Sequence, residues 1–393
     1  MYTIFNNCTL FDGINRELKE NAAIVVKDNI IENVVLERNK IPKKNDAKVI
    51  DCNGMYMLPG LINVHEHQVF KRSGFELREI LSTSDYLYSI YATKSAISSL
   101  KAGITTIREM GARNNINFAV RLAIKNKIMM GPRVIVCGTP LSITGAHASK
   151  ISWQVDGVDE VCKAVRTLLN QGADFIKVFT SCDPVETGEN ELAYSEPSLE
   201  ELEMAVKESH KKGKKVAVHC TGTKALKNVI KANVDTIEHG VYMNEEIAEE
   251  IKEKGIIYVP TISGYWEMGN SEWGWPESFH ELYRRLREPH MNSVRMAINK
   301  GVKIAIGTDS NGDFVDELCF LIKSGMSTID VLIAATKNGA ETIGLEKNIG
   351  TIEKGKIADL IILKGNPLNN IESLREINTV VLDGNVLDIG TKK

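Results

Sequence analysis

The chain has 393 residues, of which 43% are hydrophobic and 25% are charged, as in ordinary soluble globular proteins. Its formal net charge of −3 gives no electrostatic reason to expect a nucleic acid or an anionic membrane as a partner. No run of 18 apolar residues and no signal-peptide pattern occurs, so we expect neither a spanning helix nor a leader. The seven cysteines lack CxxC spacing and favour reduced, buried thiols in a cytoplasmic protein.

Both ends of the chain have the pattern of short β-strands. Residues 2–13 and 21–36 are rich in β-branched residues, with a turn at Asp28-Asn29. The last forty residues return to this pattern and contain the hairpin turn Asp383-Gly384. We therefore predict one composite β-sandwich domain built from residues 1–54 and 355–393, around a catalytic domain of residues 55–354.

The middle of the chain alternates short apolar strands with helical segments. The predicted strands are Leu61–Val64, Ile104–Ile107, Arg133–Val136, Phe175–Val178, Val216–Val218, Thr236–Ile237, Ile256–Val259 and Lys303–Ile306. One intervening helix begins with a capping box, Ser198 to Glu201, and is expected to end before Gly213. Eight strands alternating with helices predict an α/β fold, a parallel (β/α)₈ TIM barrel.

Groups able to bind a divalent metal ion lie within or just past the ends of five of these strands. In such barrels the working residues lie at the carboxyl ends of the strands. The candidates are His65, His67, Lys177, His219, His239 and Asp309. Charged side chains are seldom buried without a partner, so this joint pattern predicts a metal centre.

The individual signals differ in strength. His65 and His67 are two residues apart, so on an extended strand both side chains leave the same face and can bind one ion. Two histidines hydrogen-bonded in a polar loop are the alternative. His219 and His239, taken singly, also fit structural histidines, and Asp309 fits a turn or cap residue.

Lys177 is the most informative candidate because it is flanked by Phe175, Ile176, Val178 and Phe179. A lysine in such a setting must reach solvent, pair with an anion or change chemically. A neutral amine can add CO₂ and become a carbamate whose two oxygens could bridge two metals. An internal ion pair with Glu109 or Asp309 is the alternative.

The remaining histidines and a group of aromatic residues provide further candidates. His147 lies among small residues in the loop after the third strand, which favours a substrate contact. His210, His280 and His290 have no such placement, and we expect them to be surface or structural residues.

An aromatic loop, residues 263–278, follows the seventh strand. It contains Tyr265, Trp266, Trp273 and Trp275, which predicts a lid over the barrel mouth. Packing on the barrel rim or in a subunit contact is the alternative. Tyr242, three residues past His239, could also line the pocket.

The sequence resembles the amidohydrolase superfamily, in particular the branch with prolidase-like and imidazolonepropionase-like enzymes. The motifs that carry the resemblance are LPGLINVHEH, AGITTIRE, GPRVIVCGTPLSITGAH, GADFIKVFTS, VAVHCTG, VDTIEHG, IAIGTDS and IGTIEKGKIADLIILKGNPL. The resemblance implies the following roles: His65, His67 and Asp309 hold one metal, His219 and His239 hold the second, Lys177 bridges both as N6-carboxylysine, and His147 contacts the substrate. The implied ions are two Zn²⁺, with Mn²⁺ or Co²⁺ as alternatives.

Three departures from the family pattern concern the substrate. Arg108-Glu109 ends the second strand where an aspartate is common, and Cys220-Thr221 stands where one subgroup has a tyrosine. The loop after Asp309 lacks a histidine often seen there.

The resemblance implies hydrolysis of an amide C–N bond in a small molecule. We expect a dipeptide of the Xaa-Pro or Xaa-basic type, or an N-acyl amino acid, attacked by a metal-generated hydroxide with Asp309 as the proton shuttle. The alternatives are a cyclic amide, imidazolone or lactone as substrate, a related deaminase, and an inactive binding or scaffold relative. Lys177 argues against a mononuclear deaminase. We also expect a homo-oligomer.

Overall fold

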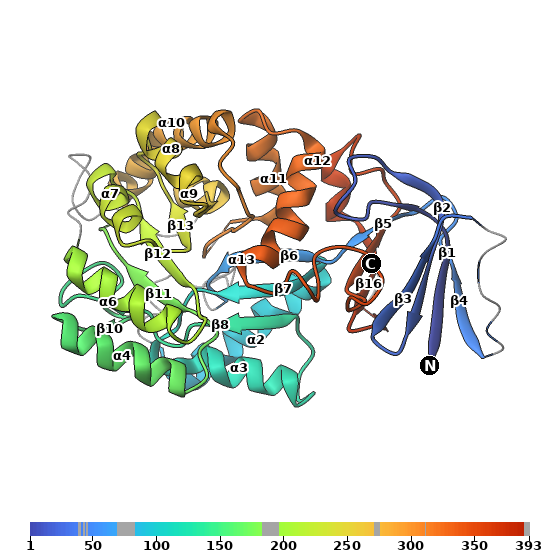
Figure 1. Cartoon of the computed structure of the whole chain (residues 1–393), viewed down its shortest axis with the longest axis horizontal. Coiled ribbons are helices and arrows are strands. Elements are labelled where there is room, and N and C mark those ends of the chain that lie inside the picture. Colours follow the sequence, from blue (N-terminus) through green and yellow to red (C-terminus); the bar gives the residue numbers. More distant parts are fainter. Residues whose placement is uncertain are drawn as a thin grey trace.

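The computed structural model describes residues 1–37, 41, 44, 46–68, 83–182, 196–270, 276–310 and 312–388. Strands from both ends of the chain lie together at one end of the molecule, beside a larger part in which helices surround parallel strands (Figure 1). The chain is therefore a mixed α/β protein, as the sequence predicts.

The terminal strands form one sheet among the described residues. They are β1 (Tyr2–Leu10), β2 (Lys19–Lys27), β3 (Ile30–Val35), β4 (Ala47–Asp51), β5 (Tyr56–Pro59), β15 (Leu360–Leu363), β16 (Ile377–Leu382) and β17 (Asn385–Leu387). The strand order is β17-β16-β15-β5-β1-β2-β3, and β4 also pairs with β1. Both predicted turns are present, with Asp28 at φ 55° and Asp383 at φ 48°.

The strands are assigned to one branched sheet, whereas the sequence predicts a two-layered sandwich. The branch lies at β1, whose first half pairs with β4 and whose end pairs with β5. Register shifts between Phe5 and Cys8 and between Cys8 and Leu10 allow this strand to bend. β5 lies beyond the predicted boundary at residue 54, yet it pairs with β1 and β15.

The parallel strands form two assigned sheets. One contains β6 (Leu61–Glu66), β7 (Ile104–Glu109) and β8 (Arg133–Val136). The other contains, in spatial order, β10 (Trp153–Gln154), β9 (Leu141–Ser142), β11 (Ile176–Phe179), β12 (Val216–Cys220), β13 (Thr236–His239) and β14 (Ile257–Val259). Seven of the eight predicted strands correspond to these strands. Their continuous burial is typical of parallel strands that are covered on both faces.

The predicted eighth strand differs from the structure. Residues 303–306 form no extended ladder, and only Ile304 makes an isolated parallel bridge, to Tyr258. The segment still lies between the two sheets, because Ala305 N donates to Tyr258 O (3.0 Å) and Val64 N donates to Ile306 O (2.8 Å). Because this segment forms only an isolated bridge, the parallel strands are divided into two sheets rather than joined in one closed barrel.

Helices cover the parallel strands. They are α2 (Asp85–Lys101), α3 (Ile116–Lys125), α4 (Val158–Asn170), α6 (Leu199–His210), α7 (Thr223–Lys231), α8 (Glu245–Glu253), α9 (Ile262–Met268), α10 (Glu277–Lys300), α11 (Phe314–Lys323), α12 (Thr328–Ile333) and α13 (Gly339–Thr342). Shorter turns are η2 (Arg113–Asn115), the π-helical η4 (Ala334–Asn338) and η5 (Ile371–Arg375). The predicted capping box of α6 is present, and Gly213 adopts φ 64° shortly after the helix ends.

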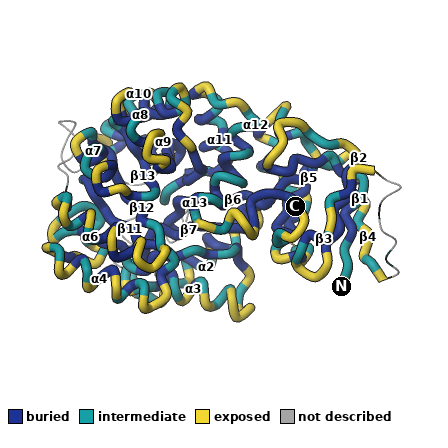
Figure 2. Tube along the Cα trace, viewed as in Figure 1, coloured by how far each residue is buried: buried dark blue, intermediate teal, exposed yellow. Residues whose placement is uncertain are grey.

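Burial is greatest along the parallel strands, where the chain is dark in Figure 2. The main core contains apolar residues of the strands and of the helix faces that pack on them, such as Ile176, Val218 and Ile237. Polar residues within and at the ends of these strands, including His65, Lys177 and His219, are buried with them. Among the described helices, none has the length and apolar character needed to cross a membrane.

Candidate metal centre

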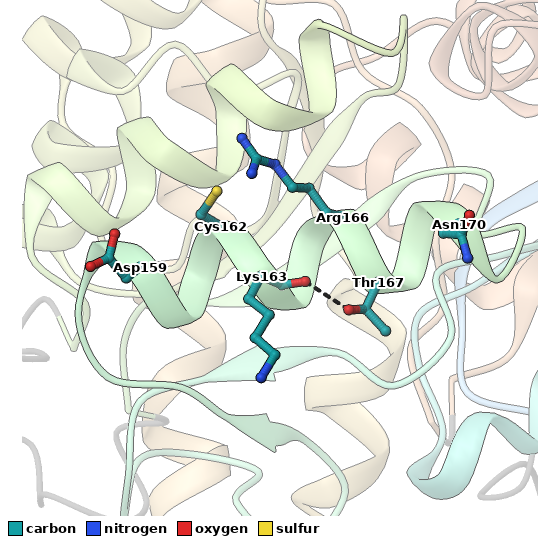
Figure 3. A pocket seen from close by; sticks show the side chains of 6 residues that line it. All are labelled: Asp159, Cys162, Lys163, Arg166, Thr167 and Asn170. Carbon is teal, nitrogen blue, oxygen red and sulfur yellow. Dashed lines mark hydrogen bonds between the residues drawn. The ribbon is translucent and has the colours of Figure 1, made fainter.

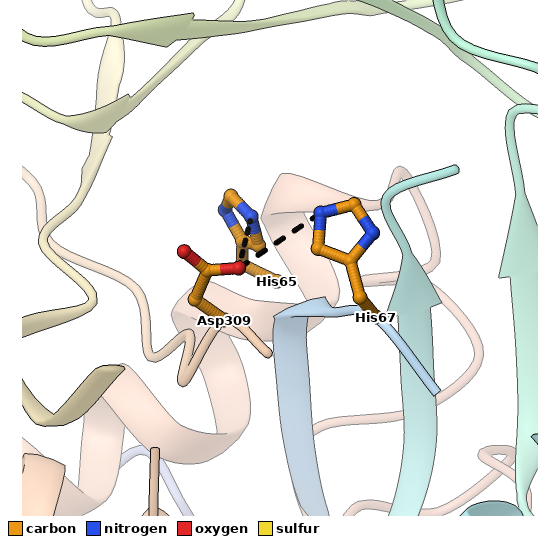
Figure 4. A group of neighbouring side chains, drawn as sticks. All are labelled: His65, His67 and Asp309. Carbon is orange, nitrogen blue, oxygen red and sulfur yellow. Dashed lines mark ion pairs between the residues drawn. The ribbon is translucent and has the colours of Figure 1, made fainter. Parts of the chain in front are cut away.

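His65, His67 and Asp309 come together at the ends of the parallel strands (Figure 4). Asp309 Oδ1 lies 3.7 Å from His65 Nε2 and 3.8 Å from His67 Nε2. One donor atom from each of the three residues lies within 4.8 Å of the others. The parallel bridge between Glu66 and Asp309 explains this meeting, since it fixes residue 309 beside β6. Two imidazole nitrogens and one carboxylate oxygen suit a divalent transition metal.

Each of these two imidazoles is oriented through its other ring nitrogen. His65 Nδ1 lies 2.9 Å from Glu238 Oε2, and His67 Nδ1 lies 3.1 Å from the carbonyl oxygen of Gly111. A carbonyl oxygen and a carboxylate accept hydrogen bonds, so both rings carry their proton on Nδ1. The lone pair of each Nε2 is thereby directed toward Asp309 and is available to a metal.

A buried ion pair with Arg108 keeps Glu238 ionised, the state in which it can accept a hydrogen bond from His65. Burial alone would raise the pKa of Glu238, but the positive charge of Arg108 and the contact with His65 lower it to about 2. Arg108 Nη2 lies 2.8 Å from Glu238 Oε1, and its Nε donates to Val64 O at 2.5 Å. The carboxylate therefore stays ionised and accepts the His65 proton.

His219 and His239 continue the cluster from the adjacent strands. Their ring centroids are 4.5 Å apart, and the His239 centroid lies 5.0 Å from that of His65. His239 Nδ1 contacts Thr261 Oγ1 at 2.7 Å. The four predicted histidine ligands thus form one continuous group.

Burial favours the neutral form of all four imidazoles. Burial lowers the pKa of His67 to about 4, and it also lowers the pKa values of His65, His219 and His239 below the ordinary value. A metal requires an unprotonated imidazole nitrogen. The site is therefore prepared for a metal without a large proton-release cost at these residues.

Two buried polar atoms of the cluster lack a hydrogen-bond partner among the described residues: Lys177 Nζ and His219 Nε2. Lys177 is 1% exposed and forms no ion pair there with Glu109 or Asp309, the alternative left open by the sequence. Burial lowers the pKa of the Lys177 amine to about 8. Unsatisfied buried polar atoms are costly and rare, so the residues present fit a metal centre that would give both atoms a partner.

Of the residues predicted to contact the substrate, His147 and Tyr265 lie beside the histidine cluster, whereas Trp266 and Tyr242 have other partners. His147 stacks on His219, with ring centroids 4.5 Å apart, and the Tyr265 ring lies 5.4 Å from that of His239. Trp266 instead packs on Phe320, with centroids 4.6 Å apart, beneath the Arg287 guanidinium. The Tyr242 backbone bonds to Thr221 and Thr223.

The predicted aromatic loop is partly helical. Residues 262–268 form α9, and α10 begins at Glu277, so only a short segment remains between the two helices. Trp273 and Trp275 lie outside the described residues. The helix places Tyr265 and Trp266 on different sides, because neighbouring helical residues are about 100° apart.

The other three histidines have structural partners. His210 Nε2 pairs with Asp235 at 2.9 Å near the surface, and His280 Nδ1 bonds to Met268 O at 2.8 Å. His290 is buried, and its Nε2 donates to the carbonyl oxygen of His239 at 2.9 Å. It therefore contacts the backbone of a candidate ligand, a link that its place in the sequence does not indicate.

The buried carboxyl of Glu109 predicts that the stability of the metal-free protein depends on pH. Burial raises its pKa to about 7, although Asn117 and Gly111 N donate hydrogen bonds to it. Because this pKa is higher in the folded than in the unfolded chain, the protonated carboxyl adds to the free energy of unfolding. The full contribution is present below pH 4.5 and is lost as the pH rises through 7. Glu109→Gln lacks this titrating group. Between pH 4.5 and 7 we therefore expect the unfolding free energy of metal-free wild type to fall by about 3 kcal/mol more than that of the metal-free variant. Urea unfolding of both proteins measures this difference, and a pH-independent difference would contradict the assignment.

Comparison with known proteins defines the family. The sequence model of the amidohydrolase family matches residues 56–387. The chain belongs to this family. It is accordingly a hydrolase that acts on amide C–N bonds, which confirms the resemblance noted in the sequence. Members of the family generally use metal ions, and this amidohydrolase has a possible site for one at His65, His67 and Asp309.

Individual relatives of this amidohydrolase cover nearly all of its length. The ochratoxinase of Aspergillus niger is 30% identical over 411 residues, covering 96% of this chain and 84% of the relative. An imidazolonepropionase of Clostridium tetani is 24% identical, covering 97% of this chain and 95% of the relative. The crystal structure of a Xaa-Pro dipeptidase with bound methionine has a TM-score of 0.88 at 29% identity, covering 98% of this chain and all of that one.

A surface hollow of about 450 Å³ on the amidohydrolase is separate from the predicted site residues (Figure 3). Its lining residues all come from α4: Asp159, Cys162, Lys163, Arg166, Thr167 and Asn170. Their spacing is that of a single helix face. A hollow along one helix brings no convergent groups together, so we assign it no catalytic role.

Proposed function

We propose that this amidohydrolase holds two divalent ions, with zinc as the first choice. His65, His67 and Asp309 would hold one ion, and His219 and His239 the other. The carbamate of Lys177 would bridge them. The observation that carries the proposal is that oriented imidazoles meet a buried amine and a buried imidazole nitrogen, and these two groups have no hydrogen-bond partner among the described residues.

When bound, such ions polarise the substrate carbonyl and lower the pKa of water to roughly 7. The protein's own residues supply the remaining steps. Asp309 is 24% exposed, and in Figure 4 its second oxygen lies on the side away from His67. We assign this carboxylate the transfer of a proton to the leaving nitrogen. His147, which stacks on His219, would donate a hydrogen bond to the substrate's carbonyl oxygen.

The proposed substrate is a dipeptide, of the Xaa-Pro or Xaa-basic type, or an N-acyl amino acid. The likeness to a Xaa-Pro dipeptidase over 98% of this chain supports the dipeptide. Tyr265, whose ring centroid lies 5.4 Å from that of His239, is the proposed aromatic contact to the substrate. A cyclic amide is the second candidate, supported by the end-to-end similarity to an imidazolonepropionase. Trp266 stays a prediction as a substrate contact, and its packing on Phe320 favours a role on the rim.

A substrate library tests the proposal. The protein is loaded with zinc in bicarbonate buffer and offered dipeptides, N-acyl amino acids and cyclic amides, and release of free amine or ring opening is measured. We expect release of particular amino acids from linear substrates. Cleavage of cyclic amides alone would replace the first candidate with the second. No cleavage of any amide by protein with two bound metals would contradict the substrate proposal.

We further propose that the two parallel sheets form one eight-stranded barrel, within a domain of residues 55–354 beside the composite domain of residues 1–54 and 355–393. The bonds of residues 303–306 to β14 and β6 support closure on one side. The bond from Asp174 N to Val136 O, at 2.8 Å, supports it on the other.

A further inference from the structure

His239 has a strained backbone that its neighbours hold in place. Its φ is 72°, in the left-handed region that residues other than glycine rarely adopt. The carbonyl oxygen of His239 accepts hydrogen bonds from Tyr258 Oη at 2.7 Å and from His290 Nε2 at 2.9 Å. Both donors are fully buried. Such strain persists only where the surroundings over-determine it, and it concentrates at functional sites.

The side chain of His239 is held by Thr261, the residue that precedes α9. Thr261 Oγ1 donates its single proton to Pro260 O at 2.6 Å. Its contact with His239 Nδ1, at 2.7 Å, must therefore be one in which the hydroxyl oxygen accepts. His239 is fixed as the Nδ1–H tautomer, and its Nε2 carries the free lone pair.

This use of Thr261 leaves α9 without an ordinary N-cap. A threonine in this position usually accepts a hydrogen bond from the second or third helical N–H, but Thr261 makes no such bond. The Glu317 carboxylate on α11 replaces it, accepting from Ile262 N at 3.0 Å and from Ser263 N at 2.6 Å. Glu317 is fully buried, and these are the first two N–H groups of α9, which have no partner within the helix.

We propose that Glu317 is a positioning residue for the metal ligand His239. By capping α9 from a different helix, it releases the Thr261 hydroxyl to orient the imidazole. This inference rests on the proposed two-metal function, because it predicts which of the two ions depends on Glu317. Glu317 caps the start of α9, and this cap leaves Thr261 free to orient His239. His239 in turn would bind the ion that it shares with His219.

Metal titration of purified, full-length protein tests the proposal. Glu317→Gln keeps the shape but has one acceptor oxygen for two N–H donors. We expect about 10–100-fold weaker zinc binding at one of the two sites, the usual cost of losing an outer partner of a ligand. Thr261→Val removes the acceptor while conserving shape, and we expect the same selective loss. If Glu317→Gln does not fold, the zinc affinities of Thr261→Val test the proposal instead. Glu208→Gln is the matched control, since Glu208 is a 6% exposed carboxylate on α6 that pairs with Arg166 and Lys211.

Double variants identify the affected ion. Combined with His239→Ala, Glu317→Gln should weaken zinc binding no further, because the dependent ligand is already absent. Combined with His67→Ala, it should impair both sites. Unchanged zinc affinities in Glu317→Gln or Thr261→Val, or equal weakening of both sites, would overturn the proposal while leaving the two-metal function intact. A wild-type protein that binds one ion or none would overturn both.

Discussion

Asp309→Asn is expected to retain the fold and to lose about 10²–10⁴-fold in turnover, the usual contribution of a positioned acid–base group. Asparagine has the size of aspartate and tolerates the φ of 59° that residue 309 adopts. The backbone bond from residue 309 N to His65 O, at 2.9 Å, is unaffected by the change. An amide cannot take up and release the proton that the leaving nitrogen requires.

Three measurements separate this role from loss of metal or fold. Thermal unfolding should give a midpoint close to that of wild type, and bound metal is counted in the same preparation. Turnover is compared at equal metal content. Ser310→Ala is the control, since it removes a hydroxyl 3.1 Å from Asp309 Oδ1 but keeps the carboxylate. A variant that binds metal and works at nearly the wild-type rate would show that Asp309 is not the proton carrier.

The strands could be predicted from the sequence because they are short, apolar and bounded by turn residues. The observed strands β6, β7 and β12 each extend two residues beyond the predicted ends, and most of these extra residues are polar ones such as His65 and Glu109. Residues 303–306 have the same apolar pattern but form no ladder, only the isolated bridge of Ile304 to Tyr258. Register between distant strands is a tertiary property that local pattern does not contain.

The candidate ligands were predictable because each lies within or directly after an apolar strand, but the groups that orient them were not. Glu238 immediately precedes His239 in the sequence and yet binds His65, 173 residues away. Thr261 and Glu317 carry no pattern that distinguishes them from an ordinary cap and an ordinary helix residue. A buried charge in an apolar strand was the one available signal for Glu238. The aromatic segment was predicted as a loop because its glycines hide the seven-residue helix α9.

Lys177→Met is expected to have opposite effects on stability and on metal binding. The metal-free variant should be about 1–3 kcal/mol more stable than metal-free wild type, because it removes a buried amine that has no hydrogen-bond partner among the described residues. Methionine also fills the space with an unbranched apolar chain. Zinc affinity and turnover should both fall. Loss of a residue that only orients a ligand costs roughly 10–100-fold, and loss of the bridging lysine should cost at least as much. Denaturant unfolding and metal titration measure the two effects separately.

Bicarbonate tests whether the lysine acts as a carbamate. The amine and CO₂ combine to give the carbamate anion and one released proton, a reaction that needs the neutral amine, which burial favours by lowering the pKa to about 8. In CO₂-depleted buffer, wild type should bind less zinc and recover when bicarbonate is added, whereas Lys177→Met should not respond. Equal zinc binding by both proteins in both buffers would exclude the bridge. A residue that costs stability in the metal-free chain and is needed for metal binding is one whose burial serves function rather than folding.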